Sequence, residues 1–131
     1  MAFDGANIWV ATVGTNSVTK LRASDGANLG TIPTGSLPIA IAFDGVNIWV
    51  SNIGGSSVTK IRTSDGAIIG TFVLGTSPGP IAFDGINIWV VSISGNIVQK
   101  LRTSDGATLN TYAVPVNSEA MAFDGANMWI A

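Results

Sequence analysis

Short runs of alternating apolar and polar residues fill the chain. In the run from Ser57 to Ser64, residues 58, 60 and 62 fall on one side and residues 59, 61 and 63 on the other. A period of two is that of a β-strand, because successive side chains point to opposite faces of the sheet. No window shows the 3.6-residue period of an amphipathic helix. The sequence therefore predicts an all-β protein.

Turn residues divide these runs into strands of regular length. In the middle of the chain the pattern predicts strands at about 38–43, 47–53, 57–63 and 67–73. The pair Asp65-Gly66 predicts a two-residue type I′ hairpin, since that turn needs positive φ angles that Asp and Gly tolerate. Asp44-Gly45 predicts another tight turn between the first two strands.

The same pattern recurs every 40 residues. The segment AFDGANIWV at 2–10 returns, with small changes, at 42–50, 82–90 and 122–130. A second segment, VTKLRASDGA at 18–27, returns at 58–67 and 98–107. We therefore expect one partial domain over 1–131, with repeats at 1–40, 41–80 and 81–120 and a partial repeat at 121–131.

Four short strands per repeat, joined by hairpins, form the blade of a β-propeller. The predicted fold is an all-β propeller of four-stranded antiparallel blades, with three full blades and one further hairpin per chain. The small residues Ala40 and Ala42 suit a first strand nearest the central axis. Tryptophan recurs at one position of the second strand, where it packs between blades or, alternatively, forms a row that stacks on a ligand: Trp9, Trp49, Trp89 and Trp129.

Composition agrees with blades that cover one another. Hydrophobic residues make up 47% of the chain and charged residues only 11%, where about 25% is typical. A net charge of −2 with six Lys and Arg argues against nucleic acid as a partner. The chain has no Cys. Membrane-spanning strands need about 9–11 residues, whereas the strands predicted here have about seven, so we expect no membrane insertion. Nothing in the sequence indicates a compartment.

Residues 48–85, IWVSNIGGSSVTKIRTSDGAIIGTFVLGTSPGPIAFDG, resemble the YVTN type of propeller repeat. Trp49-Val50-Ser51-Asn52 stands in the place of the strand that names that family. The element from Asp44-Gly45 to Trp49 is also similar to repeats of virginiamycin B lyase-like propellers. The second resemblance implies a catalytic histidine and a divalent metal ion. This chain contains no His, so no catalytic residue can be assigned through it.

The charged residues have structural explanations. All seven Asp lie in Asp-Gly turns, where the side chain caps the local backbone. The Lys and Arg pairs lie on one face of each third strand, and we expect them to form a solvated ladder that pairs with turn carboxylates. Only Glu119 departs from the repeat. We therefore expect no enzyme activity, no catalytic residue, no metal site and no cofactor.

The repeats differ mainly in two sets of loops on one face of the predicted propeller. Binding residues are disproportionately found on loops, although neutral drift in exposed loops is the favoured explanation of the variation. The ligand itself is not indicated. Candidate ligand-binding residues on this face are Thr15, Asn16, Ser56, Asn96, Asn117 and Glu119.

Three blades and a hairpin do not close a ring, since propellers use about four to eight blades. We therefore expect a homo-oligomer, with a homodimer favoured, in which the C-terminal hairpin fits the start of another copy. The function expected is a non-enzymatic, self-associating scaffold or binding module. The alternatives are a fragment of a longer, cell-surface type of propeller and, third, a virginiamycin B lyase-like enzyme. The expected oligomer interface consists of Met121, Phe123, Met128, Trp129 and Ile130.

Overall fold

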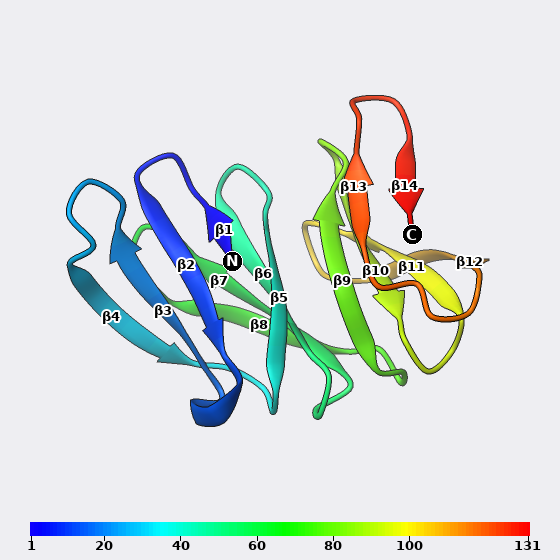
Figure 1. The fold of residues 1–131 in the computed structure, drawn as a ribbon, viewed down its shortest axis with the longest axis horizontal. Coiled ribbons are helices and arrows are strands. Elements are labelled where there is room, and N and C mark those ends of the chain that lie inside the picture. The colour runs from blue at the N-terminus through cyan, green and yellow to red at the C-terminus, as the bar shows by residue number, and fades with distance from the viewer.

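The computed structural model describes all residues, 1–131, as three four-stranded antiparallel sheets and a separate two-stranded hairpin (Figure 1). Blade 1 contains β1 (Ala2–Phe3), β2 (Asn7–Thr12), β3 (Ser17–Arg22) and β4 (Asn28–Pro33). Blade 2 contains β5 (Pro38–Phe43), β6 (Asn47–Asn52), β7 (Ser57–Arg62) and β8 (Ile68–Val73). Blade 3 contains β9 (Pro78–Phe83), β10 (Asn87–Ser92), β11 (Ile97–Arg102) and β12 (Thr108–Ala113). The hairpin consists of β13 (Met121–Phe123) and β14 (Met128–Ile130).

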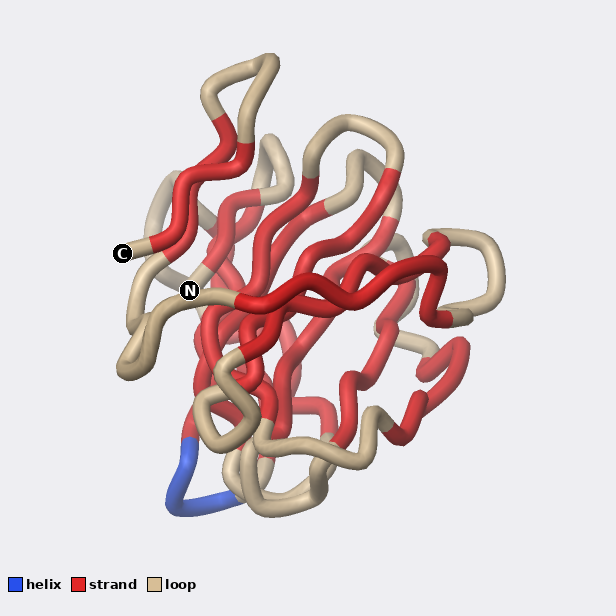
Figure 2. Tube along the Cα trace, turned by 90° about the vertical axis from the view of Figure 1, so that its right-hand side faces the viewer, coloured by secondary structure: helices blue, strands red, loops and turns tan.

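The observed strands confirm the predicted architecture. In each blade the strands follow one another in chain order, and every pair is antiparallel. The one helical element is a 3-10 turn, η1 (Val13–Thr15), between β2 and β3 (Figure 2). No helix of the protein is long and apolar enough to cross a membrane.

The turn between the first two strands of each blade is the tight turn that the sequence predicts. In blade 2 the amide of Asp44 donates to the carbonyl of Asn47 across two central residues. The first of these, Gly45, has a φ of 95°. Glycine adopts such a positive φ without strain, which suits a tight turn.

The prediction of a type I′ turn at Asp65-Gly66 is wrong. The amide of Arg62 donates to the carbonyl of Ala67 at 2.8 Å, so the loop is four residues long. Only Gly66 has a positive φ, 75°. The Asp65 carboxylate accepts from the amide of Ala67 and from the Arg62 side chain, and these bonds stabilise the longer turn.

Each blade has two different faces, which pack against different neighbours. On blade 2 the face with Trp49 also carries Ala42 and Val58, and we call it the tryptophan face. The opposite face carries Ile41, Ile48, Val50 and Ile61, and we call it the aliphatic face. Adjacent blades pack the tryptophan face of one against the aliphatic face of the next.

Two apolar seams of this kind hold the three blades together. One joins Trp9 and Val18 of blade 1 to the aliphatic face of blade 2. The other joins the tryptophan face of blade 2 to a set in blade 3 that consists of Ile81, Ile88, Val90 and Leu101. Trp9 and Trp49 are fully buried, each at 0% exposure. Packing between blades is thereby confirmed for these two tryptophans.

The first strands of successive blades lie side by side. β5 packs along β9, and β13 follows β9 on the other side (Figure 1). This order places the small residues Ala40 and Ala42 on an inner strand. Blade 1 and the β13–β14 hairpin lie at opposite ends of the row, so the ring is open.

Candidate functional site

An aspartate and a tryptophan form a fixed pair in every repeat. The indole nitrogen of Trp49 donates to Oδ2 of Asp44 at 2.7 Å. The other carboxylate oxygen accepts from the amides of Val46 and Asn47, at 2.9 and 2.6 Å. The same pair recurs in each remaining repeat as Asp4–Trp9, Asp84–Trp89 and Asp124–Trp129.

These bonds set the protonation of the carboxylates. Burial alone would raise the pKa of Asp44, but the hydrogen bonds from Trp49 and from the turn amides outweigh it and lower that pKa below its usual value. The pKa of Asp124 is lowered as well, first by the indole of Trp129 and then by the amides of Asn127 and Ala126. The aspartates are therefore held ionised by structural bonds.

The lysines do not form the solvated ladder that the sequence predicts. Lys60 is only 7% exposed, and its ammonium lies 5.0 Å from the centre of the Trp49 ring. It donates across the seam to the carbonyl of Thr103 in blade 3, at 2.5 Å. Lys20 makes the same bond to the carbonyl of Thr63 at 2.7 Å. The prediction of solvated lysines is wrong because the neighbouring blade covers the end of the side chain and supplies an acceptor.

The arginines behave as expected. Arg22, Arg62 and Arg102 are half exposed, and each pairs with the aspartate three residues ahead at 2.9 Å. The expected pairing of strand cations with turn carboxylates is confirmed for these residues. Exposed pairs of this kind add little stability, so their main role is to close the turn.

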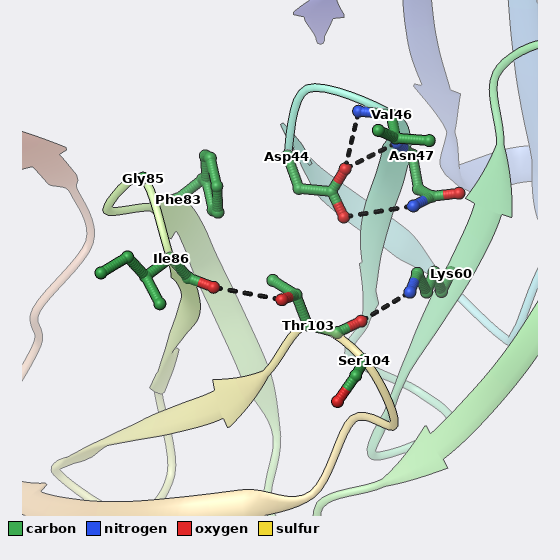
Figure 3. A pocket seen from close by; sticks show the side chains of 9 residues that line it. All are labelled: Asp44, Val46, Asn47, Lys60, Phe83, Gly85, Ile86, Thr103 and Ser104. Atoms are coloured by element: carbon green, nitrogen blue, oxygen red, sulfur yellow. Dashed lines mark hydrogen bonds between the residues drawn. The ribbon is translucent and has the colours of Figure 1, made fainter.

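A hollow of about 400 Å³ lies over the seam between blades 2 and 3 (Figure 3). Asp44 and Lys60 are the charged side chains that line it. Figure 3 shows both of them bonded to the protein, Asp44 to its own turn and Lys60 to Thr103. The hollow thus has no free charged group to recognise a ligand.

The predicted ligand-binding residues lie on the loop face, but in separate blades. Asn16, Ser56 and Asn96 have φ angles of 50°, 46° and 49°. Their carbonyls accept from the amides of Thr34, Leu74 and Val114, at the exits of the fourth strands. Thr15 shares a hydrogen bond with Ser17 at 2.6 Å. The carbonyl bonds of Asn16, Ser56 and Asn96 thus join two loops of one blade.

Asn117 and Glu119 lie between β12 and β13. Asn117 also has a positive φ, 61°. Glu119 borders a hollow of about 440 Å³ between the first strands of blades 2 and 3 and β13. It is the only charged residue there, and the other residues of the lining are apolar: Ile39, Ala40, Pro80, Ile81, Ile93, Ala120 and Met121.

A buried amide marks the Asn52 position of the YVTN-like strand. Its nitrogen donates to Thr59 at 2.9 Å, while its oxygen is buried without a partner. Gly35 lies so close that a Cβ there would overlap the Asn52 side chain. No group of three or more His, Cys, Asp or Glu side chains gathers in the protein.

The C-terminal hairpin presents its two faces to different surroundings. Met121, Phe123, Met128 and Ile130 form its aliphatic face and lie toward blade 3, as their counterparts do in the two seams. Trp129 lies on the opposite face and is 63% exposed. Of the five predicted interface residues, therefore, four face blade 3 of the same chain and one faces outward.

Beside this hairpin the tryptophan face of blade 3 is only partly covered. A groove of about 550 Å³ remains there, because the hairpin has no third or fourth strand. Lys100, which lies 5.1 Å from the ring centre of Trp89, lines the groove. Tyr112 stacks on Trp89 with ring centres 5.7 Å apart and is 43% exposed. Sequence reasoning missed both residues, although the 40-residue repeat aligns Lys100 with Lys20 and Lys60.

At the other end of the row the aliphatic face of blade 1 has no neighbour. Phe3 is 54% exposed, and Ile8, Val10 and Leu21 are partly exposed. Their counterparts in blade 2 include Ile48 and Ile61, which are fully buried. The two ends of the row therefore bear the two kinds of face that pack together in the seams.

Comparison with known structures identifies the fold. No protein-family model matches the sequence, and no curated protein is detectably similar to it. The Kuenenia stuttgartiensis hydrazine synthase structure is similar with a TM-score of 0.83 at 21% identity, over 90% of this chain and 36% of that one. The WD40 repeats of RRP9 give 0.79 at 16% identity, over 92% and 39%. A streptogramin B lyase structure gives 0.80 at 21% identity, over 95% and 44%. The chain thus has the β-propeller fold and spans less than half the length of each of these proteins.

Proposed function

We propose that this chain is a non-enzymatic β-propeller module that self-associates and serves as a scaffold or binding platform. One observation carries the proposal. The open face of blade 3 and the open face of blade 1 bear the side chains that are buried against each other in both internal seams. Burial of a large apolar side chain is worth about 1.5–3 kcal/mol, so these faces favour joining. Two copies would supply six blades, within the range of about four to eight that propellers use.

The chemistry of the polar groups supports a role without catalysis. The chain has no His and no Cys. The aspartates accept hydrogen bonds from their own turns. General acid–base work needs a group whose pKa lies near the working pH, and the pKa values of the aspartates move in the other direction.

A second candidate is a fragment of a longer propeller with an activity located elsewhere in the parent. The similar structures favour it, because the chain covers only 36–44% of their lengths. A gene that continues past residue 131 with further 40-residue repeats would support this candidate. The resemblance to a streptogramin B lyase in fold keeps an enzyme of that kind as the third candidate.

Sedimentation velocity over a range of concentrations tests self-association. We expect the wild-type chain to sediment as a discrete oligomer, and Leu21→Lys, on the open face of blade 1, to shift it toward the monomer. The matched control is Ile69→Lys, which alters an equally apolar but exposed residue on the outer strand β8. A wild-type chain that remains monomeric at every concentration, with both variants identical to it, would refute the proposal.

A further inference from the structure

We propose that two copies share a blade, in which the β13–β14 hairpin of one chain pairs with β3 and β4 of the other and takes the place of that chain's own residues 1–12. The inference rests on the self-association proposed above and names its partner and register. Three features of the two ends of the row lead to it.

The first feature is a lysine without its acceptor. Lys20 and Lys60 each donate to a carbonyl 43 residues ahead, at Thr63 and Thr103, in the turn after the third strand of the next blade. Lys100 lies over its tryptophan in the same way, but the chain has no third strand beyond β14. The equivalent turn carbonyl left over in the chain is that of Ala23, after β3. A second copy that brings β3 beside β14 supplies this acceptor.

The second feature is a contact between an aromatic ring and a glycine. Phe72 packs so tightly on Gly106 of the next blade that a Cβ there would overlap the ring, and Ile32 lies over Gly66 at a less close distance, 3.3 Å from the position of a Cβ. Tyr112 is the counterpart of Phe72 in blade 3, and its ring is partly exposed at the groove. The remaining turn glycine is Gly26, which has the same positive φ and nothing within 4 Å of a Cβ. The space over Gly26 in the β3–β4 turn is thus open, and the ring of Tyr112 from a second copy would pack there.

The third feature is the outward tryptophan of the hairpin. Trp9 pairs across the strands with Lys20 and is buried, whereas Trp129 is exposed. In the observed register of the blades, β14 beside a partner's β3 pairs Asn127 with Arg22, Met128 with Leu21, and Trp129 with Lys20, as β2 pairs within its own chain. Trp129 would then occupy the buried place of Trp9 in the partner.

Exchange is favoured because the two hairpins are nearly interchangeable. Residues 122–127 and 2–7 are both AFDGAN. Within one chain, β1 forms only two residue pairs with β2. β13 forms three with β14, and Ala120 and Ala131 extend the ladder by two further backbone bonds. The incoming hairpin therefore replaces five of the six pairs that β2 makes with β3, all but Thr12 with Ser17, and its own two strands are more extensively paired.

A second copy is the occupant because β3 is the third strand whose aliphatic face is free. The corresponding residues of β7 and β11, Ile61 and Leu101, are fully buried by the preceding blade. Leu21 of β3 has no such cover. The groove and β3 lie at opposite ends of the molecule (Figure 1), so one chain does not bring them together.

Disulfide trapping tests the register, since the chain has no cysteine of its own. The pair Arg22→Cys and Asn127→Cys occupies positions that face each other only between copies. The amide of Ala23 donates to the carbonyl of Ala6, so residues 7 and 22 form a pair without mutual hydrogen bonds, in which side chains lie close. We expect the oxidised double variant to have twice the mass of one chain under denaturing, non-reducing conditions, and equal mixtures of the two single variants to give the same species.

Two matched variants control the result. Asn47→Cys with Arg62→Cys places the same pair inside blade 2, and its disulfide should leave the mass of one chain. Asn7→Cys with Arg22→Cys locks the N-terminal hairpin onto β3. In its oxidised form this variant should lose self-association, and reduction should restore it.

The possible outcomes separate the inference from the function on which it rests. If wild-type copies associate but residues 22 and 127 do not cross-link while the blade 2 control does, the shared blade is refuted and self-association stands. If the locked variant associates as well as wild type, exchange is refuted in favour of intact blades that dock. A chain that is monomeric throughout refutes both the shared blade and self-association. The groove would then be filled by further strands of a longer polypeptide or by another protein.

Discussion

At the scale of single residues, the aspartate–tryptophan pairs link stability to pH. Hydrogen bonds lower the pKa values of Asp4, Asp44 and Asp84, although burial opposes them. The folded state therefore binds fewer protons than the unfolded state near the usual aspartate pKa of about 3.9. The stability that this difference contributes is present above that pH and is lost as pH falls toward the folded-state values.

We predict that the free energy of unfolding stays level from about pH 7 to pH 5 and falls below about pH 4. Denaturant midpoints measured along this series check the prediction.

Asp44→Asn should cost about 1–3 kcal/mol at neutral pH, because its amide group would face the indole N–H as a second donor. The same variant should also lose less of its free energy of unfolding as the pH falls below about 4, because the asparagine does not titrate. Asp65→Asn is the exposed control and should lower stability far less. Equal costs would show that the indole bond adds nothing.

The buried lysine gives a second prediction at this scale. Lys60→Ala removes a charged donor to Thr103 and a cation on Trp49, for which we expect a loss of about 1.5–3 kcal/mol. Trp49→Ala should cost more, about 3–5 kcal/mol. The matched control is Lys100→Ala at concentrations where the chain is monomeric, since Lys100 has no acceptor within the chain. A midpoint shift for Lys100→Ala equal to that for Lys60→Ala would contradict the role of the bond across the seam.

At the scale of elements, most of the fold could be predicted because the repeat shows every strand three times. The predicted strand at 38–43 coincides with β5, and the other strands of blade 2 end within one residue of their predicted limits. The turn after β7 could not be predicted, because the pair Asp65-Gly66 is common to two-residue and longer loops, and the side-chain bonds of Asp65 decide between them. The burial of Lys60 was missed for a related reason. Alternation assigns a residue to a face but does not show what covers that face.

The candidate site was predictable only in part. The sequence predicts that the C-terminal hairpin is a place of association, a prediction that stays open, and it treats the side chains of that hairpin as one set. The cross-strand pairs divide them, with Met121 and Ile130 on one face and Trp129 on the other. Lys100 and Tyr112 line the groove because the β13–β14 sheet has only two strands. The local sequence around these two residues does not indicate this.

A matched pair of glycines tests the packing between elements. Gly106→Ala and Gly26→Ala introduce the same backbone strain, because the two φ angles are 71° and 73°. Only the first also forces a methyl group against Phe72. We therefore predict that Gly106→Ala is the more destabilising in the monomer, by about 1–3 kcal/mol for the overlap, and that Gly26→Ala instead weakens self-association. Denaturation midpoints and sedimentation of both variants decide this, and equal behaviour in both assays would contradict it.

At the scale of the whole molecule, the two ends of the chain should respond differently to deletion. Removal of residues 121–131 deletes the hairpin that the partner's β3 needs, so the discrete oligomer should give way to smaller, heterogeneous or aggregated species. Removal of residues 1–12 vacates the place that the partner's hairpin fills, so association should persist or become tighter. Sedimentation of the two truncated chains checks this asymmetry, and equal loss of the oligomer from both would show that the hairpins do not exchange.

The measurement that tests the central claim most directly is the mass of the wild-type chain in solution by light scattering. In the proposed dimer, two copies close the open faces at the two ends of the row against each other. We predict a discrete species with twice the mass of one chain at concentrations where the faces are saturated. A single chain mass at every concentration, with the native fold retained, would contradict the account.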